Sequence, residues 1–149
     1  MKTFATTAAL LLSLALGSAS ANELFVTSAK SAGGQAFALD INSSGTATAL
    51  QIRVAVGEGL KVDLSKCVSG LPGTHSGACG YRNGKVTVLV HSETNEMLPS
   101  GMLSIGSIAV SGASAKELSV VELLAFDRNG NEVSISSDDQ APPTRSLAK

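Results

Sequence analysis

Apolar and polar residues alternate with a period of two along most of this chain. The pattern is clearest between residues 50 and 56, where every second residue is Leu, Ile or Val. A period of two places successive side chains on opposite faces of a strand, so each segment of this kind is predicted to be a half-buried β-strand. The predicted strands are residues 23–29, 37–41, 50–56, 60–64, 86–90, 102–110, 118–126 and 132–135.

Turn residues separate these segments. Asn129-Gly130 is the strongest turn signal, because both residues tolerate the positive φ that a type I′ turn requires. It predicts a C-terminal hairpin between residues 118–126 and 132–135. Gly106 interrupts an alternating segment and predicts a β-bulge there. The other predicted turns are at Gly33-Gly34, Ser44-Gly45, residues 57–59, Asn83-Gly84 and residues 99–101.

The number and spacing of the predicted strands indicate the fold class. Short strands at close spacing, without a convincing amphipathic helix, predict an all-β fold, either a sandwich or a barrel. A length of 149 residues is typical of one domain. Residues 136–149 contain Asp138-Asp139 and Pro142-Pro143 with almost no apolar side chain, so they are predicted to form a disordered C-terminal tail.

The N-terminal segment has the features of a secretory signal peptide. Lys2 supplies a positive charge, residues 8–16 are apolar, and residues 19–21 form a small-x-small cleavage site. The apolar run is too short to span a bilayer, which takes about 20 residues. We expect residues 1–21 to be removed before Asn22 and the protein to be secreted, to the periplasm or beyond, with no membrane span. The alternative is that residues 1–21 form a buried helix.

Export decides how the two cysteines are interpreted. Cys67 and Cys79 are the only cysteines in the chain. Oxidising compartments favour a disulfide between them, and closing a loop of this size contributes about 3 kcal/mol in the chain-entropy view. The alternative is a metal site that includes His75, but this set lacks a fourth ligand and needs free thiolates. We predict a Cys67–Cys79 disulfide, no metal site and no cofactor.

Composition and motifs give no basis for catalysis or for nucleic-acid binding. A formal net charge of −1 offers no electrostatic surface for nucleic acid. The chain has only His75 and His91 as bases for a hydrolytic triad, and Ser76 lacks the Gly-x-Ser-x-Gly elbow. Glu93 and Glu96 lie in a polar loop and are interpreted as solvated surface. We therefore predict no catalytic residues and a protein that is not an enzyme.

Residues 127–132 are similar to part of a calcium-binding loop. Oxygen-bearing side chains occur there at alternate positions, but the remaining ligands and the distant bidentate glutamate of an EF-hand are missing. A hairpin turn accounts for the same residues. The turn is therefore the preferred interpretation, with calcium binding as the alternative.

Few aromatic side chains are available for a binding surface. Phe37 lies on an apolar face and Phe126 is expected to pack in the interior, so Tyr81 is the candidate exposed platform. A flat cellulose-type site is disfavoured, although a smaller hydrogen-bonding site for sugar stays open. Protein interfaces favour aromatic residues and Arg, so Tyr81 and Arg82 are the candidate binding residues. The alternative is that both simply decorate an exposed hairpin.

Several motifs resemble those of cohesin-type domains, over residues 24–135. Residues 35–42 resemble an early strand of that family, and residues 49–56 with 60–64 resemble the strand pair that follows. Three further matches lie in residues 84–91, 100–105 and 126–133, the last of which resembles the closing hairpin. The resemblance implies a jelly-roll-like antiparallel β-sandwich of about eight or nine strands, spanning residues 22–135.

The same resemblance implies a binding function. Cohesin-type domains bind proteins, especially dockerin modules, and another branch of the superfamily binds polysaccharides. We therefore expect a secreted, non-enzymatic protein-binding module with a dockerin-like or other protein partner. The first alternative is a carbohydrate-binding module with a polysaccharide partner. The second is an adhesion or structural protein that self-assembles through the edges of its sheets.

Overall fold

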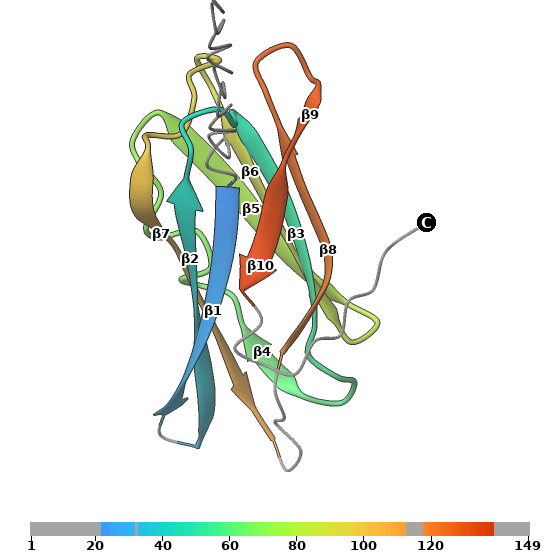
Figure 1. The fold of residues 1–149 in the computed structure, drawn as a ribbon. Coiled ribbons are helices and arrows are strands. Elements are labelled where there is room, and N and C mark those ends of the chain that lie inside the picture. Colours follow the sequence, from blue (N-terminus) through green and yellow to red (C-terminus); the bar gives the residue numbers. More distant parts are fainter. Residues whose placement is uncertain (1–21, 32, 113–117, 139–149) are drawn as a thin grey trace, which may run out of the picture.

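Two five-stranded β-sheets pack face to face in a computed structural model that describes residues 22–31, 33–112 and 118–138 (Figure 1). Sheet A has the strand order β10-β1-β2-β7-β4, and sheet B has the order β5-β6-β3-β8-β9. The strands of sheet A are β1 (Asn22–Ser31), β2 (Gly34–Ser43), β4 (Lys61–Asp63), β7 (Gly101–Ser111) and β10 (Ile135–Asp138). Those of sheet B are β3 (Ala49–Ala55), β5 (His75–Arg82), β6 (Lys85–Ser92), β8 (Ser119–Phe126) and β9 (Glu132–Val133).

The predicted all-β sandwich is confirmed, and every predicted strand segment overlaps a strand of the structure. The described residues form ten strands, two more than the eight predicted segments. Strand β5 lies in a Gly-rich segment without apolar alternation. Residues 132–135 are divided between two strands, since the chain leaves sheet B after Val133 and enters sheet A at Ile135.

Strand β10 runs parallel to β1, whereas the other strand pairs are antiparallel. Its register pairs Asn22 with Ile135 and Glu23 with Ser136, and it continues to Asp138. The first three residues of the predicted tail therefore lie in a strand, because backbone pairing with β1 does not require apolar side chains. The predicted leader, residues 1–21, and the rest of the predicted tail, residues 139–149, lie outside the described residues.

The core fills the space between the two sheets. The inward side chains of β3 and β6 meet those of β2 and β7, as the alternation predicts. Ile52 is 0% exposed, while its neighbours Gln51 and Arg53 are half-buried. None of the described residues forms a helix long and apolar enough to cross a membrane.

The type I′ turn lies in a different hairpin from the one predicted. Asn83 and Gly84 have φ values of 52° and 72° and connect β5 to β6 as a two-residue loop. Strands β8 and β9 do form the predicted hairpin, but Gly130 has positive φ and Asn129 does not. The Asp127 carboxylate accepts hydrogen bonds from the backbone N–H groups of Asn129 and Asn131, at 2.8 and 2.9 Å. These bonds stabilise a longer loop, so the predicted type I′ turn at Asn129-Gly130 is wrong.

The predicted bulge at Gly106 is confirmed and serves as a docking point for a loop. The register of β7 against β2 shifts at this position, which leaves Ile105 as the extra residue. The Gly70 N–H donates to the Ile105 carbonyl at 3.0 Å, and the Ser107 N–H donates to the Lys66 carbonyl at 2.8 Å. Residues 65–71, which we call the docking loop, are thereby held against β7.

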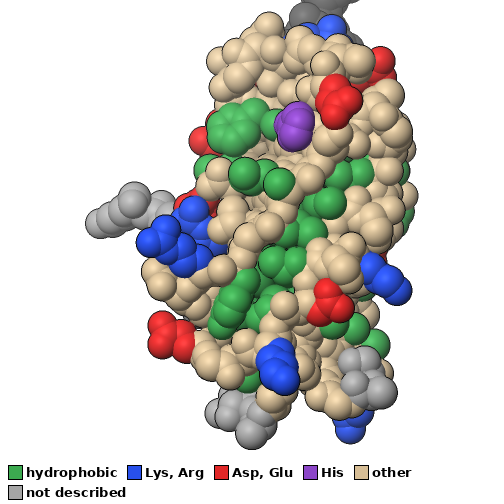
Figure 2. Space-filling view, turned by 180° about the vertical axis from the view of Figure 1, so that it is seen from behind, with side chains coloured by type: hydrophobic (Ala, Val, Ile, Leu, Met, Phe, Trp, Pro, Cys, Tyr) green, Lys and Arg blue, Asp and Glu red, His purple; other side chains and the backbone are tan. Residues whose placement is uncertain are grey.

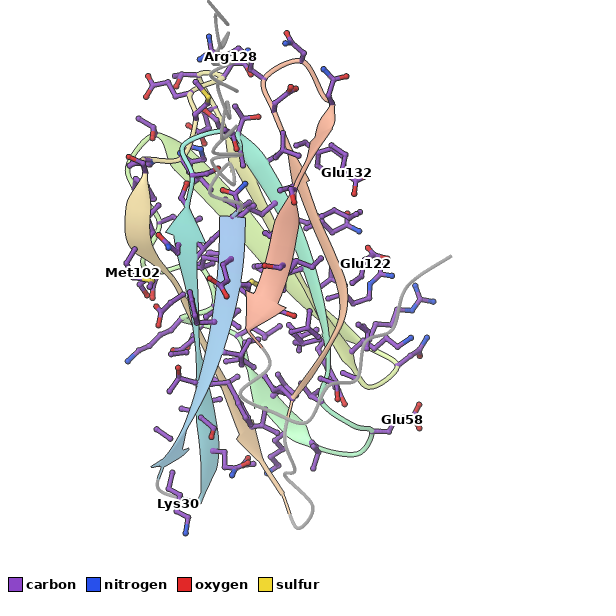
Figure 3. The ribbon with its side chains drawn as sticks, viewed as in Figure 1. Lys30, Glu58, Met102, Glu122, Arg128 and Glu132 are labelled. Atoms are coloured by element: carbon purple, nitrogen blue, oxygen red, sulfur yellow. A yellow bond between two sulfur atoms is a disulfide. The ribbon has the colours of Figure 1, made fainter. Side chains whose placement is uncertain are left out.

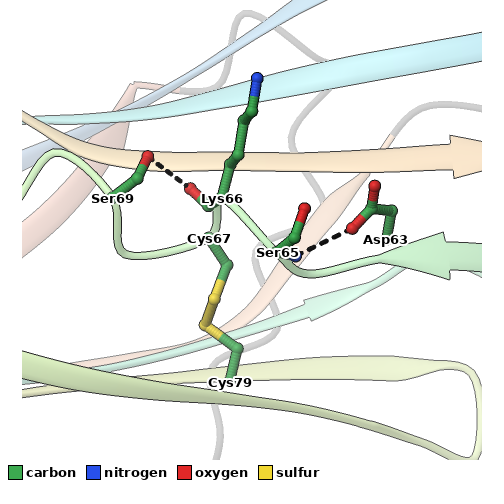
Figure 4. Close-up of a disulfide and its surroundings, with 6 residues drawn as sticks. All are labelled: Asp63, Ser65, Lys66, Cys67, Ser69 and Cys79. Atoms are coloured by element: carbon green, nitrogen blue, oxygen red, sulfur yellow. Dashed lines mark hydrogen bonds between the residues drawn. A yellow bond between two sulfur atoms is a disulfide. The ribbon is translucent and has the colours of Figure 1, made fainter.

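The predicted disulfide joins this loop to sheet B. Figure 4 shows Cys67 of the docking loop bonded to Cys79 of β5, with a Cα–Cα distance of 6.6 Å. Since the loop is hydrogen-bonded to β7 of sheet A, the disulfide links the two sheets at the side of the sandwich where β5 lies.

Removal of the disulfide is expected to lower stability without changing the fold. Because the bond closes a short loop, Cys67→Ser should reduce the free energy of unfolding by about 3 kcal/mol, measured by urea denaturation. Mass spectrometry of the wild type without reductant should show a mass lower by the hydrogens of both thiols. The variant should be insensitive to reductant; two free thiols in exported wild-type protein would contradict the prediction.

Candidate functional site

The outer surface of sheet B is the candidate functional site. It consists of the side chains of β5, β6, β3 and β8 that point away from the core, and we call it the β5–β8 face. The strand registers align these side chains in rows across the sheet. From β5 to β8 the rows are Ser76, His91, Ala49 and Phe126; then Ala78, Leu89, Gln51 and Leu124; then Gly80, Thr87, Arg53 and Glu122; and finally Arg82, Lys85, Ala55 and Ser119.

A hydrogen-bonded polar network lies in the middle of this face. The Arg53 Nη1 atom is 3.3 Å from the Glu122 Oε2 atom, and Gln51 Nε2 donates to Glu122 Oε1. Arg53 Nε also donates to Thr87 Oγ1 at 3.4 Å. Figure 3 labels Glu122, which lies on β8 and points away from the core. A half-exposed ion pair of this kind contributes at most about 1 kcal/mol to stability, so the main effect of the network is to hold these four side chains in one arrangement.

Apolar side chains surround the polar network. Leu89 is 43% exposed, and Leu124 and Phe126 are half-buried on the same face. Ala78, the cross-strand neighbour of Leu89 on β5, is small, so it leaves the leucine side chain uncovered on that side. Figure 2 views the molecule from behind and shows hydrophobic side chains gathered in a band on this side, with charged side chains at its margins. The face thus combines exposed apolar area with fixed polar groups, as the centres of protein interfaces do.

The two ends of the β5–β8 face carry opposite charge. Arg82 and Lys85 are cross-strand partners beside the β5–β6 turn, and both are exposed. At the other end, Glu93 and Glu96 follow β6 in an exposed loop, where Ser76 donates a hydrogen bond to Glu93. Arg53–Glu122 is the only salt bridge found in the described part of the chain. The end charges are therefore free to meet charges on a bound molecule.

The structure places the two predicted binding residues on opposite sides of β5. The Tyr81 ring packs against the core, and its hydroxyl donates to the Gly57 carbonyl at 2.7 Å. Arg82 is exposed at the end of the β5–β8 face. Joint contact of Tyr81 and Arg82 with a partner stays a prediction. The period of two along β5 is the signal that separates them, and it was not visible because β5 was not predicted as a strand.

Phe126 also lies differently from what was expected. Its neighbour Ala125 is fully buried and pairs with the core residue Leu50, so Phe126 projects outward beside Ala49. The expectation that Phe126 packs in the interior is wrong. A bulge obscured the alternation of β8. Arg53 pairs with Glu122 and Val54 with Val120, so Val121 is an extra residue in β8 and the pattern shifts by one residue there.

The two histidines lie in different environments. His75 is 6% exposed, and its Nδ1 atom is 2.9 Å from Thr74 Oγ1. Burial lowers the pKa of His75 because the charged imidazolium loses its hydration, so the ring is neutral at pH 7. Ser76 points to the opposite side of β5 and bonds Glu93, so the Ser76 hydroxyl does not contact the His75 ring. His91 is exposed on the β5–β8 face.

The Asp127 carboxylate is engaged within its own turn. Hydrogen bonds from the backbone of Asn131 and Asn129 lower its pKa, because they favour the charged carboxylate. These bonds account for the oxygen-rich residues 127–132 as a turn. Across residues 22–31, 33–112 and 118–138, no group of three or more His, Cys, Asp or Glu side chains could hold a metal ion.

Comparison with solved structures identifies the fold. No family model matches the chain, and no curated protein matches it in sequence. A non-cellulosomal cohesin from the archaeon Archaeoglobus fulgidus is similar with a TM-score of 0.59 at 14% identity, over 79% of this chain and 86% of that one. A type II cohesin domain from the cellulosome of Acetivibrio cellulolyticus gives 0.58 at 9% identity, over 80% and 92%.

A third structure adds a complex. The type II cohesin–X-dockerin complex from Acetivibrio cellulolyticus contains a chain that is similar with a TM-score of 0.53 at 10% identity, over 78% of this chain and 96% of that one. The protein therefore has the cohesin fold, and the resemblance that the sequence motifs indicated is confirmed for the architecture.

Proposed function

We propose that this chain is a secreted, non-enzymatic protein-binding module whose β5–β8 face receives its partner. The observation that carries the proposal is the exposed Leu89 on this face, beside the hydrogen-bonded network of Arg53, Gln51 and Glu122. Burying an exposed leucine against a partner is favourable, and pre-arranged polar groups lose little freedom on binding. The face thus offers both affinity and specificity.

The proposed partner is a dockerin-like protein module. One structure with the same fold was solved as a cohesin–X-dockerin complex, which supports this class of partner. The Cys67–Cys79 disulfide and the predicted leader support a location outside the cytoplasm, where such assemblies would form. The proposed interaction needs no catalytic group and no cofactor.

A charge placed at Leu89 is expected to abolish partner binding. Leu89→Asp should weaken binding at least tenfold, because a desolvated carboxylate would face the partner's apolar surface. The matched control is Met102→Asp, since Met102 is 62% exposed on β7 of the opposite sheet. The experiment immobilises wild type and both variants and compares the proteins captured from the exported fraction of the source organism. Binding to purified dockerin modules is then measured by titration.

The control gives the experiment its specificity. A partner retained by the wild type and by Met102→Asp, but lost with Leu89→Asp at unchanged melting temperature, supports the proposed face. Retention of the partner by Leu89→Asp would place the binding surface elsewhere. Retention of the wild type on insoluble polysaccharide, with no captured protein, would replace the proposal by carbohydrate binding.

Arg82 is proposed as a contact at the cationic end of the same face, and Tyr81, whose ring lies on the other side of β5, is proposed as a contact beside the β5–β6 turn. Arg82→Ala removes an exposed charge and leaves the core intact, and Tyr81→Phe removes only the hydroxyl that bonds Gly57. These two variants, titrated against the captured partner, test the pair without unfolding the hairpin.

A further inference from the structure

The outer edge of β5 carries unpaired backbone groups. Among the described strands, β5 is at the edge of sheet B and pairs only with β6. In the two-residue turn at Asn83-Gly84, the Lys85 N–H donates to the Arg82 carbonyl. Because backbone groups alternate in direction along a strand, the N–H and C=O groups of Ser76, Ala78, Gly80 and Arg82 point toward β6. The N–H and C=O groups of Gly77, Cys79 and Tyr81 therefore point away from the sheet. Among the described residues, no hydrogen bond to these groups is found.

This edge lacks the usual protection against pairing with another chain. Sheet edges are commonly protected by shortness, charge or proline. Strands β4, β9 and β10 are short, with 3, 2 and 4 residues, whereas β5 has 8. Residues 75–81 contain no Lys, Glu, Asp or Pro. The edge is therefore long enough to accept another strand, and residues 75–81 carry none of the charged residues or prolines that would prevent pairing.

The docking loop leaves this edge open. An added Cβ at Gly77 would meet the side chains of Val68 and Leu71, which shows that the loop packs against the inner surface of β5. Ala78 and Gly80, which point outward on the β5–β8 face, are exposed. A strand that approaches in the plane of sheet B therefore meets the unpaired backbone of β5 directly.

We propose that two copies of this chain pair through β5 in an antiparallel, two-fold symmetric arrangement centred on Cys79. In this register the backbone of Cys79 forms hydrogen bonds with the backbone of Cys79 in the second copy. The backbone of Gly77 pairs in the same way with that of Tyr81, so all the outward N–H and C=O groups of these residues are satisfied. Both sheets B then form one continuous sheet, a known mode of strand addition. The backbone pairing uses the edge of β5, whereas the proposed partner contacts the β5–β8 face around Leu89; Arg82 is shared by both proposals.

Charge complementarity selects this register and a second copy as the occupant. Centring on Cys79 places Arg82 of one copy opposite Ser76 of the other. Ser76 bonds the Glu93 carboxylate, so Arg82 meets Glu93 across the interface, and two-fold symmetry repeats the contact at the other end. Arg82 and Glu93 are both exposed, and neither takes part in a salt bridge within the described chain. The central residues Ala78 and Gly80 face each other without steric conflict.

The test measures association of the exported protein alone. Sedimentation velocity from about 1 µM to about 500 µM should show a concentration-dependent monomer–dimer equilibrium. Arg82→Glu and Glu93→Arg should each weaken the dimer at least tenfold at low salt, and the double variant should recover most of the loss because the charges are exchanged. The control is Arg128→Glu, since Arg128, which is labelled in Figure 3, is exposed in the β8–β9 loop and lies at the edge of sheet B opposite to β5.

A second measurement reports the backbone pairing itself. Hydrogen exchange at the amides of Gly77, Cys79 and Tyr81 should slow as the protein concentration rises, and Ala78→Lys should remove this effect with the melting temperature unchanged. A chain that stays monomeric throughout overturns the proposal. A dimer whose stability is unaffected by Ala78→Lys, by Arg82→Glu and by Glu93→Arg also overturns the proposal. Partner capture through Leu89 with no dimer would leave the proposed function standing and remove only this inference.

Discussion

Gly106→Ala is expected to destabilise the protein severely, although it adds a single methyl group. An added Cβ would lie 2.3 Å from the Lys66 carbonyl oxygen and 2.4 Å from the Cys67 carbonyl carbon, and both are backbone atoms. The docking loop would have to leave the bulge, with loss of the Gly70–Ile105 and Ser107–Lys66 hydrogen bonds. We expect a loss of about 2–4 kcal/mol in the free energy of unfolding, measured by urea denaturation.

Gly80→Ala is the matched control for this variant. Gly80 lies in β5, where an added Cβ meets no atom within 4 Å and φ is not positive. The free energy of unfolding of the Gly80→Ala variant should differ from that of the wild type by less than about 0.5 kcal/mol. Equal denaturation midpoints for Gly106→Ala and Gly80→Ala would show that the docking loop does not rest on the bulge.

Ile52→Asp is expected to prevent folding, whereas Gln51→Asp should be tolerated. Ile52 is 0% exposed at the centre of β3, so its replacement buries an unpaired carboxylate at a cost of several kcal/mol, about 4 or more. Gln51 lies on the β5–β8 face, where the change removes one hydrogen bond and places an acid beside Glu122. That loss should be about 1 kcal/mol.

Circular dichroism and urea denaturation of the purified variants separate these outcomes. Ile52→Val provides a measurable core substitution if Ile52→Asp yields no folded protein, with an expected loss of about 1 kcal/mol. Equal stability of Ile52→Asp and Gln51→Asp would mean that the register of β3 is displaced by one residue.

The candidate site depends on features that the sequence shows only in part. Side chains of β3 and β6 on the β5–β8 face, such as Arg53 and Thr87, follow from alternation once the inward residues are known. Their contact with Glu122 could not be predicted, because it depends on β8 lying beside β3, and these strands are far apart in the chain. The bulge opposite Arg53 then decides that Glu122, rather than Val121, faces Arg53.

Local sequence determined the elements whose physical cause is itself local. Alternating residues 50–56 and 86–90 became strands with the predicted inward faces, because a period of two can bury only one face of a sheet. Gly106 produced the predicted bulge, and two nearby cysteines produced the predicted disulfide.

Tertiary structure decided the features that depend on a neighbour distant in the chain. Strand β5 has almost no strand-forming side chains of its own, and it is extended because β6 supplies its hydrogen bonds and the docking loop covers its inner face. For the same reason residues 136–138 form a strand beside β1, and Tyr81 turns inward while Arg82 turns outward. Backbone hydrogen bonds are satisfied by whichever strand lies alongside, and side-chain sequence alone does not encode that partner.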